Sequence, residues 1–400
     1  MPPAGPGKFV AGARRRESAS AGPLPVFVSR SPFRSYTPRV IDTDHKLADF
    51  LSRFRHATWV AVDTEADSLH AYPEKVCLIQ ISTAAGDELL DPLAPLDLAP
   101  FFQALSAHEL LMHGADYDLR LLHKHHRFTP RAVFDTMLAA RLLGQRQFGL
   151  NHLVARHLAV TLEKGPQKAN WARRPLTERM ECYARNDVHS LKVLSDQLRA
   201  ELQAKGRLTW HQESCARLIA ECARAPRTEL DSEWRVKGSH ALDRPALAVL
   251  RELWKWRERE AIAANRPPYF ILSHETMVAL AAAATNSGHV QNLIPARYSP
   301  RRRAALDKAL EHGRAVPADR HPELLKPITR RPSLAEIHRF RELEKRRDAH
   351  AARLSLDPTL IASRTMLARL AQNWHAHEPE LMSWQRELLQ SKSEVQTAEF

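Results

Sequence analysis

Two acidic residues separated by one position follow an apolar run near the start of the chain. Asp63 and Glu65 flank Thr64 at the end of a predicted strand, and residues i and i+2 of a strand project from the same face. Carboxylates held that close repel one another, so the arrangement is favourable chiefly when a cation neutralises it. Taken alone, the Asp-x-Glu pattern also fits an ordinary strand terminus.

Two further motifs carry carboxylates at positions where they could meet the first pair. Asp118 follows a His-Gly turn where a predicted strand ends and a helix begins, and its neighbour Asp116 is placed to cap that helix. Tyr183 and Asp187 are four residues apart in a later helix, so a phenol and a carboxylate share one helical face. Each motif alone also fits a solvated helix.

The elements that must position these residues alternate between short strands and helices. Strands are predicted over residues 59–63, 76–82, 88–91, 110–113 and 132–134. Helices are predicted over 43–56, 116–126, 150–158 and 176–203, with a further helix that Asp135 or Thr136 could cap. Because the first three strands fit an antiparallel meander and later strands alternate with helices, we predict an α/β fold with a mixed sheet.

After Gly206 the chain reads as helical with proline-marked loops and no convincing strand. Shifting the sequence by 90 positions aligns eight identical residues without a gap. The first members of these pairs are Leu253, Arg257, Ala261, Pro268, Ile271, Ser273, Leu280 and Ala281. We therefore predict two copies of one small helical domain, over residues 235–295 and 330–392.

The composition sets broad limits on the class of protein. A length of 400 residues with 44% hydrophobic and 26% charged residues suffices for two or three domains with their own cores. Four cysteines without a Cys-x-x-Cys pair argue against a structural zinc site or a disulfide framework, and they suit a reducing cytosol. No apolar run approaches the roughly 20 residues of a membrane span. We expect a soluble, cytoplasmic protein without a membrane partner.

The net charge of +13 is concentrated in two segments. Residues 1–40 hold seven Lys or Arg against one Glu, and residues 296–353 hold sixteen against eight Asp or Glu, which leaves the rest nearly neutral. Two basic segments indicate contact with a polyanion such as nucleic acid. A solubilising tail and a solvated helix face would give the same pattern. Residues 1–38, rich in Pro, Gly, Ser and Arg, are predicted to be a disordered basic leader.

In combination, the order and spacing of the three motifs resemble the DEDD exonucleases of the tyrosine subgroup. Additional similar segments narrow the resemblance to the ribonuclease D family: residues 78–82, 134–136, 174–176 and 183–191, together with Trp171. The duplicated helical segment resembles the HRDC domain, of which ribonuclease D carries two copies. The resemblance implies a ribonuclease H-like 3′-5′ exonuclease domain over 39–205, HRDC-like domains over 235–295 and 330–392, and a basic linker over 296–329.

The resemblance also implies a chemistry. Asp63, Glu65, Asp118 and Asp187 would hold two divalent ions, Mg²⁺ or Mn²⁺, which suit oxygen ligands, and Asp63 would bridge them. Tyr183 would orient the attacking water. The expected activity is metal-dependent 3′-to-5′ hydrolysis of RNA with a free 3′ end, releasing nucleoside monophosphates, with tRNA precursors as the expected partners.

Other residues near the motifs have more than one interpretation. His113 could hold a turn or contact substrate, and Trp171 could stack a base or pack in the core. Arg174 could bind phosphate, and Gln80 is expected to make a buried hydrogen bond. The remaining nearby acidic residues are assigned to turns and caps: Asp67, Asp91 and Asp135.

Two other functions remain compatible with the sequence. A DNA exonuclease of the same superfamily would use the same carboxylates, because the chemistry does not involve the 2′-hydroxyl. A catalytically silent RNA-binding protein could keep the fold. The presence of Tyr183 and all four carboxylates disfavours the silent protein, and the two helical copies disfavour the DNA enzyme.

Overall fold

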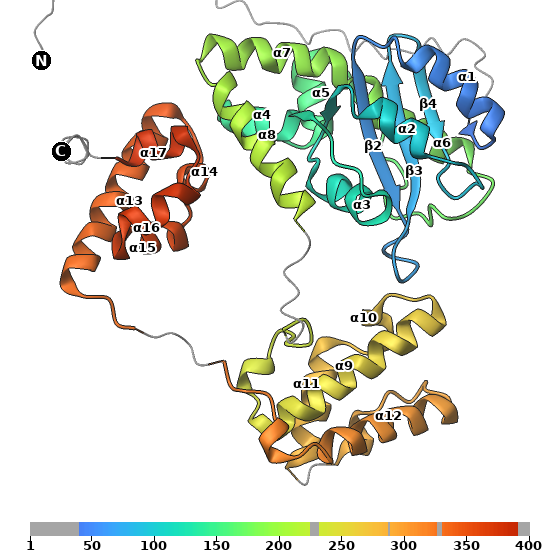
Figure 1. The fold of residues 1–400 in the computed structure, drawn as a ribbon, viewed down its shortest axis with the longest axis vertical. Helices are drawn as coiled ribbons and strands as arrows, with labels where there is room; N and C mark the ends of the chain where they lie inside the picture. Colours follow the sequence, from blue (N-terminus) through green and yellow to red (C-terminus); the bar gives the residue numbers. More distant parts are fainter. Residues whose placement is uncertain (1–39, 225–231, 287–288, 326–329, 391–400) are drawn as a thin grey trace, which may run out of the picture. The chain divides into compact units, whose positions relative to one another are not determined.

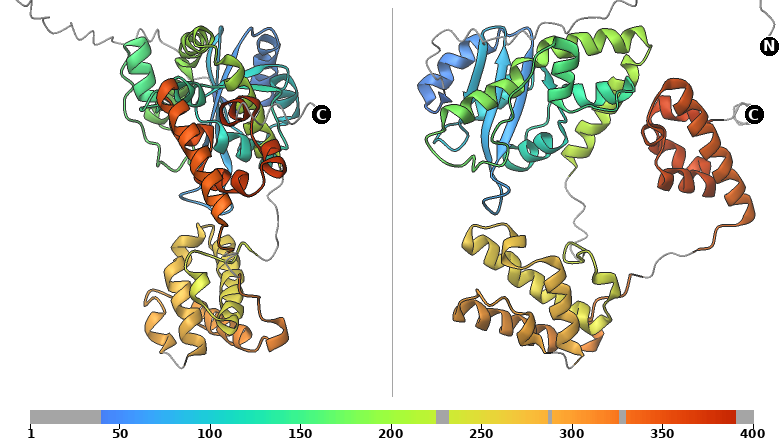
Figure 2. Two further views of the ribbon diagram at one scale, coloured as in Figure 1. Left: turned by 90° about the vertical axis from the view of Figure 1, so that its left-hand side faces the viewer. Right: turned by 180° about the vertical axis from the view of Figure 1, so that it is seen from behind.

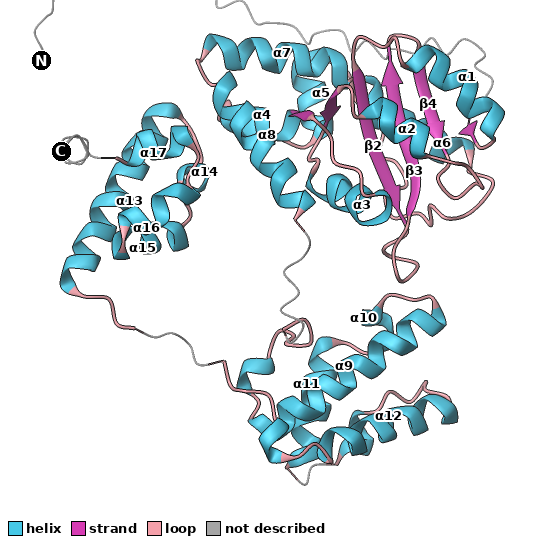
Figure 3. Ribbon diagram, viewed as in Figure 1, coloured by secondary structure: helices cyan, strands magenta, loops and turns pink. Residues whose placement is uncertain are grey.

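The computed structural model describes residues 40–224, 232–286, 289–325 and 330–390, and the predicted basic leader lies outside them. The described residues comprise a sheet-containing part up to residue 224 and two helical parts, from residues 232 and 330 (Figure 1). Among the described residues, strands occur only in the first part (Figure 3).

The sheet is mixed, as predicted. Its strands are β1 (Val40–Ile41), β2 (Val60–Ala66), β3 (Val76–Thr83), β4 (Gly86–Leu90), β5 (Glu109–Met112) and β6 (Ala132–Asp135). The spatial order is β1-β4-β3-β2-β5-β6. β2, β3 and β4 form the predicted antiparallel meander, whereas the pairs β1–β4, β2–β5 and β5–β6 are parallel. The two-residue strand β1 was not predicted.

Eight helices accompany the sheet in the described residues up to 224. They are α1 (Asp44–Phe54), α2 (Ala99–Leu105), α3 (Asp116–His126), α4 (Thr136–Leu142), α5 (Leu150–Leu158), α6 (Glu178–His189), α7 (Leu191–Ala204) and α8 (Leu208–Ala223). The prediction of one continuous helix over 176–203 is wrong, because the chain breaks at Ser190 into α6 and α7. Ala184 of α6 packs in one hydrophobic cluster, whereas Val188 of α6 and Leu194 of α7 pack in another.

Threonine and aspartate side chains, which are common N-cap residues, cap three of these helices. Thr43 caps α1, Asp135 caps α4 and Thr177 caps α6, each accepting a backbone N–H of the first turn. The prediction that Asp116 caps α3 is wrong. The N-cap is Ala115, and Asp116 instead forms an ion pair with Arg120 one turn later, at 2.9 Å.

Helices cover both faces of the sheet (Figures 1 and 2). On one face Val62 and Ile79 pack in a cluster with residues of α1, α2 and α3. On the other face Leu78 and Leu89 pack with Trp171 and residues of α6. Since side chains alternate along a strand, Asp63 and Glu65 of β2 lie on the face that α6 covers.

The two helical parts repeat the same order of helices. The first contains α9 (Arg244–Ala264), α10 (Pro268–Ile271), α11 (His274–Thr285) and α12 (Pro300–Arg314), and the second contains α13 (Leu334–Leu354), α14 (Pro358–Ile361), α15 (Arg364–Gln372), α16 (Trp374–His377) and α17 (Ser383–Leu389). The first three helices of each part begin 90 residues apart, which supports the internal duplication. Both long helices end in a left-handed residue, Asn265 or Ser355.

Two global properties follow from the described residues. None of their helices is both long and apolar enough to cross a membrane. The four cysteine thiols, Cys77, Cys182, Cys215 and Cys222, are free.

Candidate active site

The carboxyl ends of two parallel strands bring the first two motifs to one edge of the sheet. β2 carries Asp63 and Glu65, both partly buried, and the neighbouring β5 leads through a short turn into α3, which carries Asp118. The hydroxyl of Thr64 donates to Asp118 Oδ1 at 2.5 Å, and both side chains are buried. This hydrogen bond ties the motif on β2 directly to the motif on α3.

Asp135 holds the turn from which α3 starts. Its Oδ1 accepts the Gly114 N–H at 3.1 Å, and its Oδ2 accepts the Ala115 N–H at 2.8 Å. The same carboxylate caps α4 through the N–H groups of Met137 and Leu138. Four backbone donors from two segments therefore satisfy one buried anion and fix the turn that leads to the Asp118 helix.

The third motif lies on α6, which packs against β2, β3 and β4. Tyr183 and Asp187 are one turn apart on this helix, and the Tyr183 phenol, Asp187 and Gln167 line the same cavity. The helix thus places the phenol and the carboxylate over the sheet face that carries Asp63. We refer to Asp63, Glu65, Asp118 and Asp187 as the carboxylate cluster.

The loop before α6 packs against the Tyr183 ring. A Cβ at Gly165 would fall 1.5 Å from Tyr183 Cδ2, so only glycine leaves the ring in place. Trp171, with 0% exposure, lies behind the same ring at a centroid distance of 6.1 Å. Because no face of the Trp171 indole is accessible, the structure supports core packing over base stacking.

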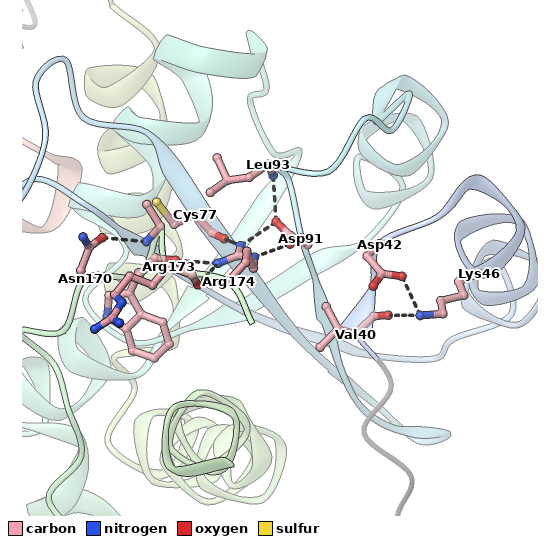
Figure 4. Close-up of polar contacts among 11 residues, drawn as sticks. Val40, Asp42, Lys46, Cys77, Asp91, Leu93, Asn170, Arg173 and Arg174 are labelled. Atoms are coloured by element: carbon pink, nitrogen blue, oxygen red, sulfur yellow. Dashed lines mark hydrogen bonds and ion pairs between the residues drawn. The ribbon is translucent and has the colours of Figure 1, made fainter. Parts of the chain in front are cut away.

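Arg174 holds this loop in place through hydrogen bonds and an ion pair (Figure 4). Its Nε and Nη2 form a bidentate pair with Asp91 at 2.5 and 2.6 Å, and Nη2 also donates to the Cys77 carbonyl at 2.7 Å. Nη1 donates to the carbonyls of Trp171 and Arg173 at 2.8 and 2.9 Å. Since a guanidinium has five N–H donors, none remains for a phosphate, and the expected substrate contact by Arg174 gives way to a structural role.

A cavity of about 380 Å³ opens at the site. Asp63, Tyr183, Asp187 and His113 line it, whereas Glu65 and Asp118 are not part of its wall. Residues 149–152 at the start of α5, Gln167 and Leu191 complete the lining. Residues 149–152 and Gln167 carry no motif that would have predicted this position, because only the folded chain brings α5 and the loop before α6 to this cavity.

The carboxylate cluster is electrostatically strained. Burial, followed by the charges of the other three cluster members, raises the pKa of Asp63 well above its usual range. Burial and the charges of Asp187 and Asp118 raise the pKa of Glu65 to about 9. Burial raises the pKa of Asp187 to about 7 and that of Asp118 to about 6, against the Thr64 hydrogen bond. Burial is also the main cause that raises the pKa of Tyr183, so this phenol stays protonated.

The donor set of the cluster fits divalent cations with a preference for oxygen. Within the described ranges, none of its four members is ion-paired with Lys, Arg or His, so each negative charge adds to the repulsion. In the described residues, no group of three or more His, Cys, Asp or Glu side chains lies close enough together to hold a metal ion as it stands. The fit therefore rests on the donor chemistry: carboxylate oxygens with unbalanced charge are ligands for Mg²⁺ or Mn²⁺.

Gln80 departs from the prediction of a buried hydrogen bond. It is fully buried on β3, directly opposite Asp63 in the strand register. Neither Oε1 nor Nε2 of its amide has a hydrogen-bond partner among the described residues. The neighbours on this face include the apolar side chains of Leu78 and Leu89, which offer no donor or acceptor.

Comparison with known proteins agrees with the fold. The family model described as 3′-5′ exonuclease matches residues 38–203, and the model described as HRDC domain matches residues 246–290. Fold and carboxylate cluster together define a 3′-to-5′ exonuclease followed by an HRDC domain.

Two relatives and one solved structure narrow this class. Ribonuclease D of Granulibacter bethesdensis is 29% identical over 374 residues, which cover 90% of this chain and 92% of the relative. Ribonuclease D of Zymomonas mobilis is 35% identical over 240 residues, 59% of this chain and 61% of the relative. The crystal structure of Escherichia coli RNase D shares the fold, with a TM-score of 0.68, 24% identity and coverage of 85% and 91%. The chain is similar to ribonuclease D proteins along most of its length, and its first part matches the 3′-5′ exonuclease model. These similarities indicate a 3′-to-5′ exoribonuclease.

Proposed function

We propose that the protein hydrolyses RNA from a free 3′ end in a reaction that needs two divalent ions, Mg²⁺ or Mn²⁺, and releases nucleoside monophosphates. The observation that carries the proposal is the carboxylate cluster, in which burial and the charges of other members raise the pKa of Asp63 and of Glu65, and whose four acidic groups form no ion pair with a Lys, Arg or His of the described residues. Asp63 faces the charges of the other three members, which is the placement expected for a ligand that bridges two ions.

The residues of the cavity have different roles in the proposed hydrolysis. Bound divalent ions supply a water of lowered pKa and neutralise the charge that develops on the leaving oxygen. The protonated phenol of Tyr183, held by α6 beside Asp187, orients that water by hydrogen bonding and does not act as a base. The attacking oxygen forms a bond to phosphorus, the bond from phosphorus to the 3′-oxygen breaks, and the 3′-oxygen takes up a proton. The product is a nucleoside 5′-monophosphate and an RNA shortened by one nucleotide.

The helical parts extend the contact with RNA, and the first part has the more suitable surface. Tyr269 and Phe270 are 64% and 53% exposed and stand edge to face. The Arg301 side chain of the same part is 81% exposed, with Glu260 3.7 Å away, whereas Arg347 of the second part is only 11% exposed and paired with Asp348. Exposed aromatic rings suit an unpaired RNA strand, because bases can stack on them. We therefore expect RNA affinity that falls steeply with salt.

Structured RNAs such as tRNA precursors are the proposed substrates. The E. coli relative is described as an exoribonuclease involved in structured RNA processing, and curated relatives bear the name ribonuclease D. A catalytic cavity with separate helical domains suits such substrates, because one part binds the body of the RNA while the other trims its 3′ end.

A time course on a 5′-labelled RNA with an unpaired 3′ end tests the proposal. The RNA and its DNA counterpart are incubated with wild-type protein or Asp63→Asn, in Mg²⁺, in Mn²⁺ and with chelator. We expect a ladder that shortens from the 3′ end on RNA, and no ladder in the variant or with chelator. Equal or faster trimming of DNA would replace the proposal with a DNA exonuclease. No trimming of either polymer, with RNA binding intact, would indicate a silent RNA-binding protein.

A further inference from the structure

His113 occupies a place in the cavity that the reaction scheme does not use. It follows β5, directly before the Gly114 turn, and lines the same cavity as Asp63, Tyr183 and Asp187. Its side chain is therefore close to any nucleotide held there, yet it is not a member of the carboxylate cluster.

A fixed hydrogen-bond chain decides which ring nitrogen of His113 carries the proton. The Thr136 hydroxyl donates its single proton to the Met112 carbonyl at 3.1 Å. Thr136 Oγ1 can then only accept from His113 Nδ1, which lies 2.8 Å away. The proton of a neutral imidazole at this position is therefore on Nδ1, and burial lowers the pKa of His113, which favours the neutral ring.

The other ring nitrogen, Nε2, is left as an acceptor on a side chain that lines the cavity. Nε2 has no hydrogen-bond partner in the described residues, and it is not fully buried. A lone pair at Nε2 repels phosphate oxygens, which are acceptors themselves. In a nucleoside monophosphate the donors are the ribose hydroxyls and the base N–H groups, and only the hydroxyls have the same position whichever base is present.

We propose that Nε2 of His113 accepts a hydrogen bond from a ribose hydroxyl of the nucleotide in the cavity. This inference rests on the proposed function, because it assumes that a 3′-terminal nucleotide enters the cavity. If the hydroxyl is the 2′-hydroxyl, His113 selects RNA over DNA. If it is the 3′-hydroxyl, His113 selects a free, unphosphorylated 3′ end.

Equilibrium binding of product nucleotides tests the inference without turnover. Dissociation constants in Mn²⁺ are measured by calorimetry for adenosine 5′-monophosphate and its 2′-deoxy and 3′-deoxy analogues, with wild type and His113→Ala. We expect the variant to weaken binding of the full nucleotide roughly three- to tenfold, the value of one neutral hydrogen bond. One deoxy analogue should bind both proteins equally well, and that analogue identifies the hydroxyl.

Two further variants separate recognition from folding. His113→Gln keeps an acceptor and should recover part of the lost affinity. Thr136→Val removes the acceptor of the Nδ1 proton. This variant should also bind the full nucleotide more weakly than the wild type does, and its affinity for the same deoxy analogue should be unchanged. An equal loss for all three nucleotides, or no loss for any, would overturn the inference. Shortening of RNA by the wild type reports on the proposed function independently, so failure of one is distinguishable from failure of the other.

Discussion

Two groups of acidic residues in the sheet-containing part differ in their burial and, above all, in their partners. The structural group is Asp67, Asp91 and Asp135, with exposures of 0%, 5% and 1%. Lys75 forms an ion pair with Asp67 at 2.5 Å, and Arg174 forms an ion pair with Asp91. Four backbone N–H groups donate hydrogen bonds to Asp135. The carboxylate cluster has none of these cations. The charges that act on Asp63 and Glu65 are those of other members of the cluster.

The comparison shows that burial alone does not identify a functional carboxylate. A buried anion is stable where donors or cations from the protein compensate it. Where that compensation is missing, as in the carboxylate cluster, the charge is balanced by protons or by bound cations. The missing partners, more than the depth of the side chains, mark the site.

The largest expected effect follows from a change within the cluster. Asp63→Asn removes the proposed bridging ligand, so exonuclease activity should fall on the order of a thousandfold or more. Because the change also removes repulsion from Glu65 and Asp187, stability without metal should be unchanged or higher. Initial rates on labelled RNA and thermal unfolding in chelator measure the two effects. A large loss of stability would put Asp63 in the structural group.

The opposite pattern is expected for a member of the structural group. Asp135→Asn removes a charge that accepts four N–H donors, so the free energy of unfolding should fall by about 2–4 kcal/mol. Urea unfolding of the variant and wild type, with metal absent, gives this difference. Activity should fall much less than for Asp63→Asn when both are measured well below the unfolding temperature. Stability equal to wild type would contradict the proposed support of the Gly114 turn.

The response to pH and metal sharpens the comparison further. Glu65 and Asp187, with pKa values raised to about 9 and about 7, retain protons that the unfolded chain has lost above about pH 4. The metal-free folded state therefore binds more protons between these pH values, and its stability falls as pH rises. Divalent ions need the ionised carboxylates and displace those protons.

Mn²⁺ should accordingly raise the unfolding temperature by a few degrees, and by more at pH 8 than at pH 6. Thermal unfolding with and without Mn²⁺ at both pH values measures this difference. Asp63→Asn provides the control, since its response to Mn²⁺ should be much smaller. A shift that is independent of pH, or equal in the control, would argue against metal binding at the cluster.

The smallest expected effect concerns two adjacent arginines. Arg174→Gln breaks the pair with Asp91 and loosens the loop behind Tyr183, so stability should fall by about 1–2 kcal/mol. The maximal rate should fall more than the apparent substrate affinity, because Tyr183 is misplaced while phosphate contacts remain. Arg173→Gln is the matched control, with little effect on stability. Steady-state kinetics that show a higher KM and an unchanged kcat for Arg174→Gln would restore a phosphate-binding role.

Local sequence signals predicted the elements on which the site is built. The strands β2, β3, β5 and β6 lie within three residues of their predicted bounds, because apolar runs end at polar or turn residues. α3 and α5 also lie at their predicted positions. The short helix α2 was missed, since Ala99–Leu105 is brief and follows a proline-rich stretch that indicates a loop.

What the sequence could not provide are contacts between distant segments. Asp116 has the right type and place for a cap, but Asp135 from another strand takes over the support of that turn. Arginine is a residue type that often binds phosphate, but Arg174 donates hydrogen bonds to Asp91, which lies 83 residues earlier in the chain. Gln167 carries no motif, and only the packing of its loop over α6 brings it to Tyr183.

The most direct test of the central claim is to count the divalent ions that bind to the carboxylate cluster. Mn²⁺ titration followed by electron paramagnetic resonance reports free and bound ion for wild type, Asp63→Asn and Asp135→Asn at pH 8. We predict two ions per chain for the wild type and for folded Asp135→Asn, and the loss of at least one ion in Asp63→Asn. Equal stoichiometry and affinity in all three proteins would contradict the assignment of the cluster as the metal site.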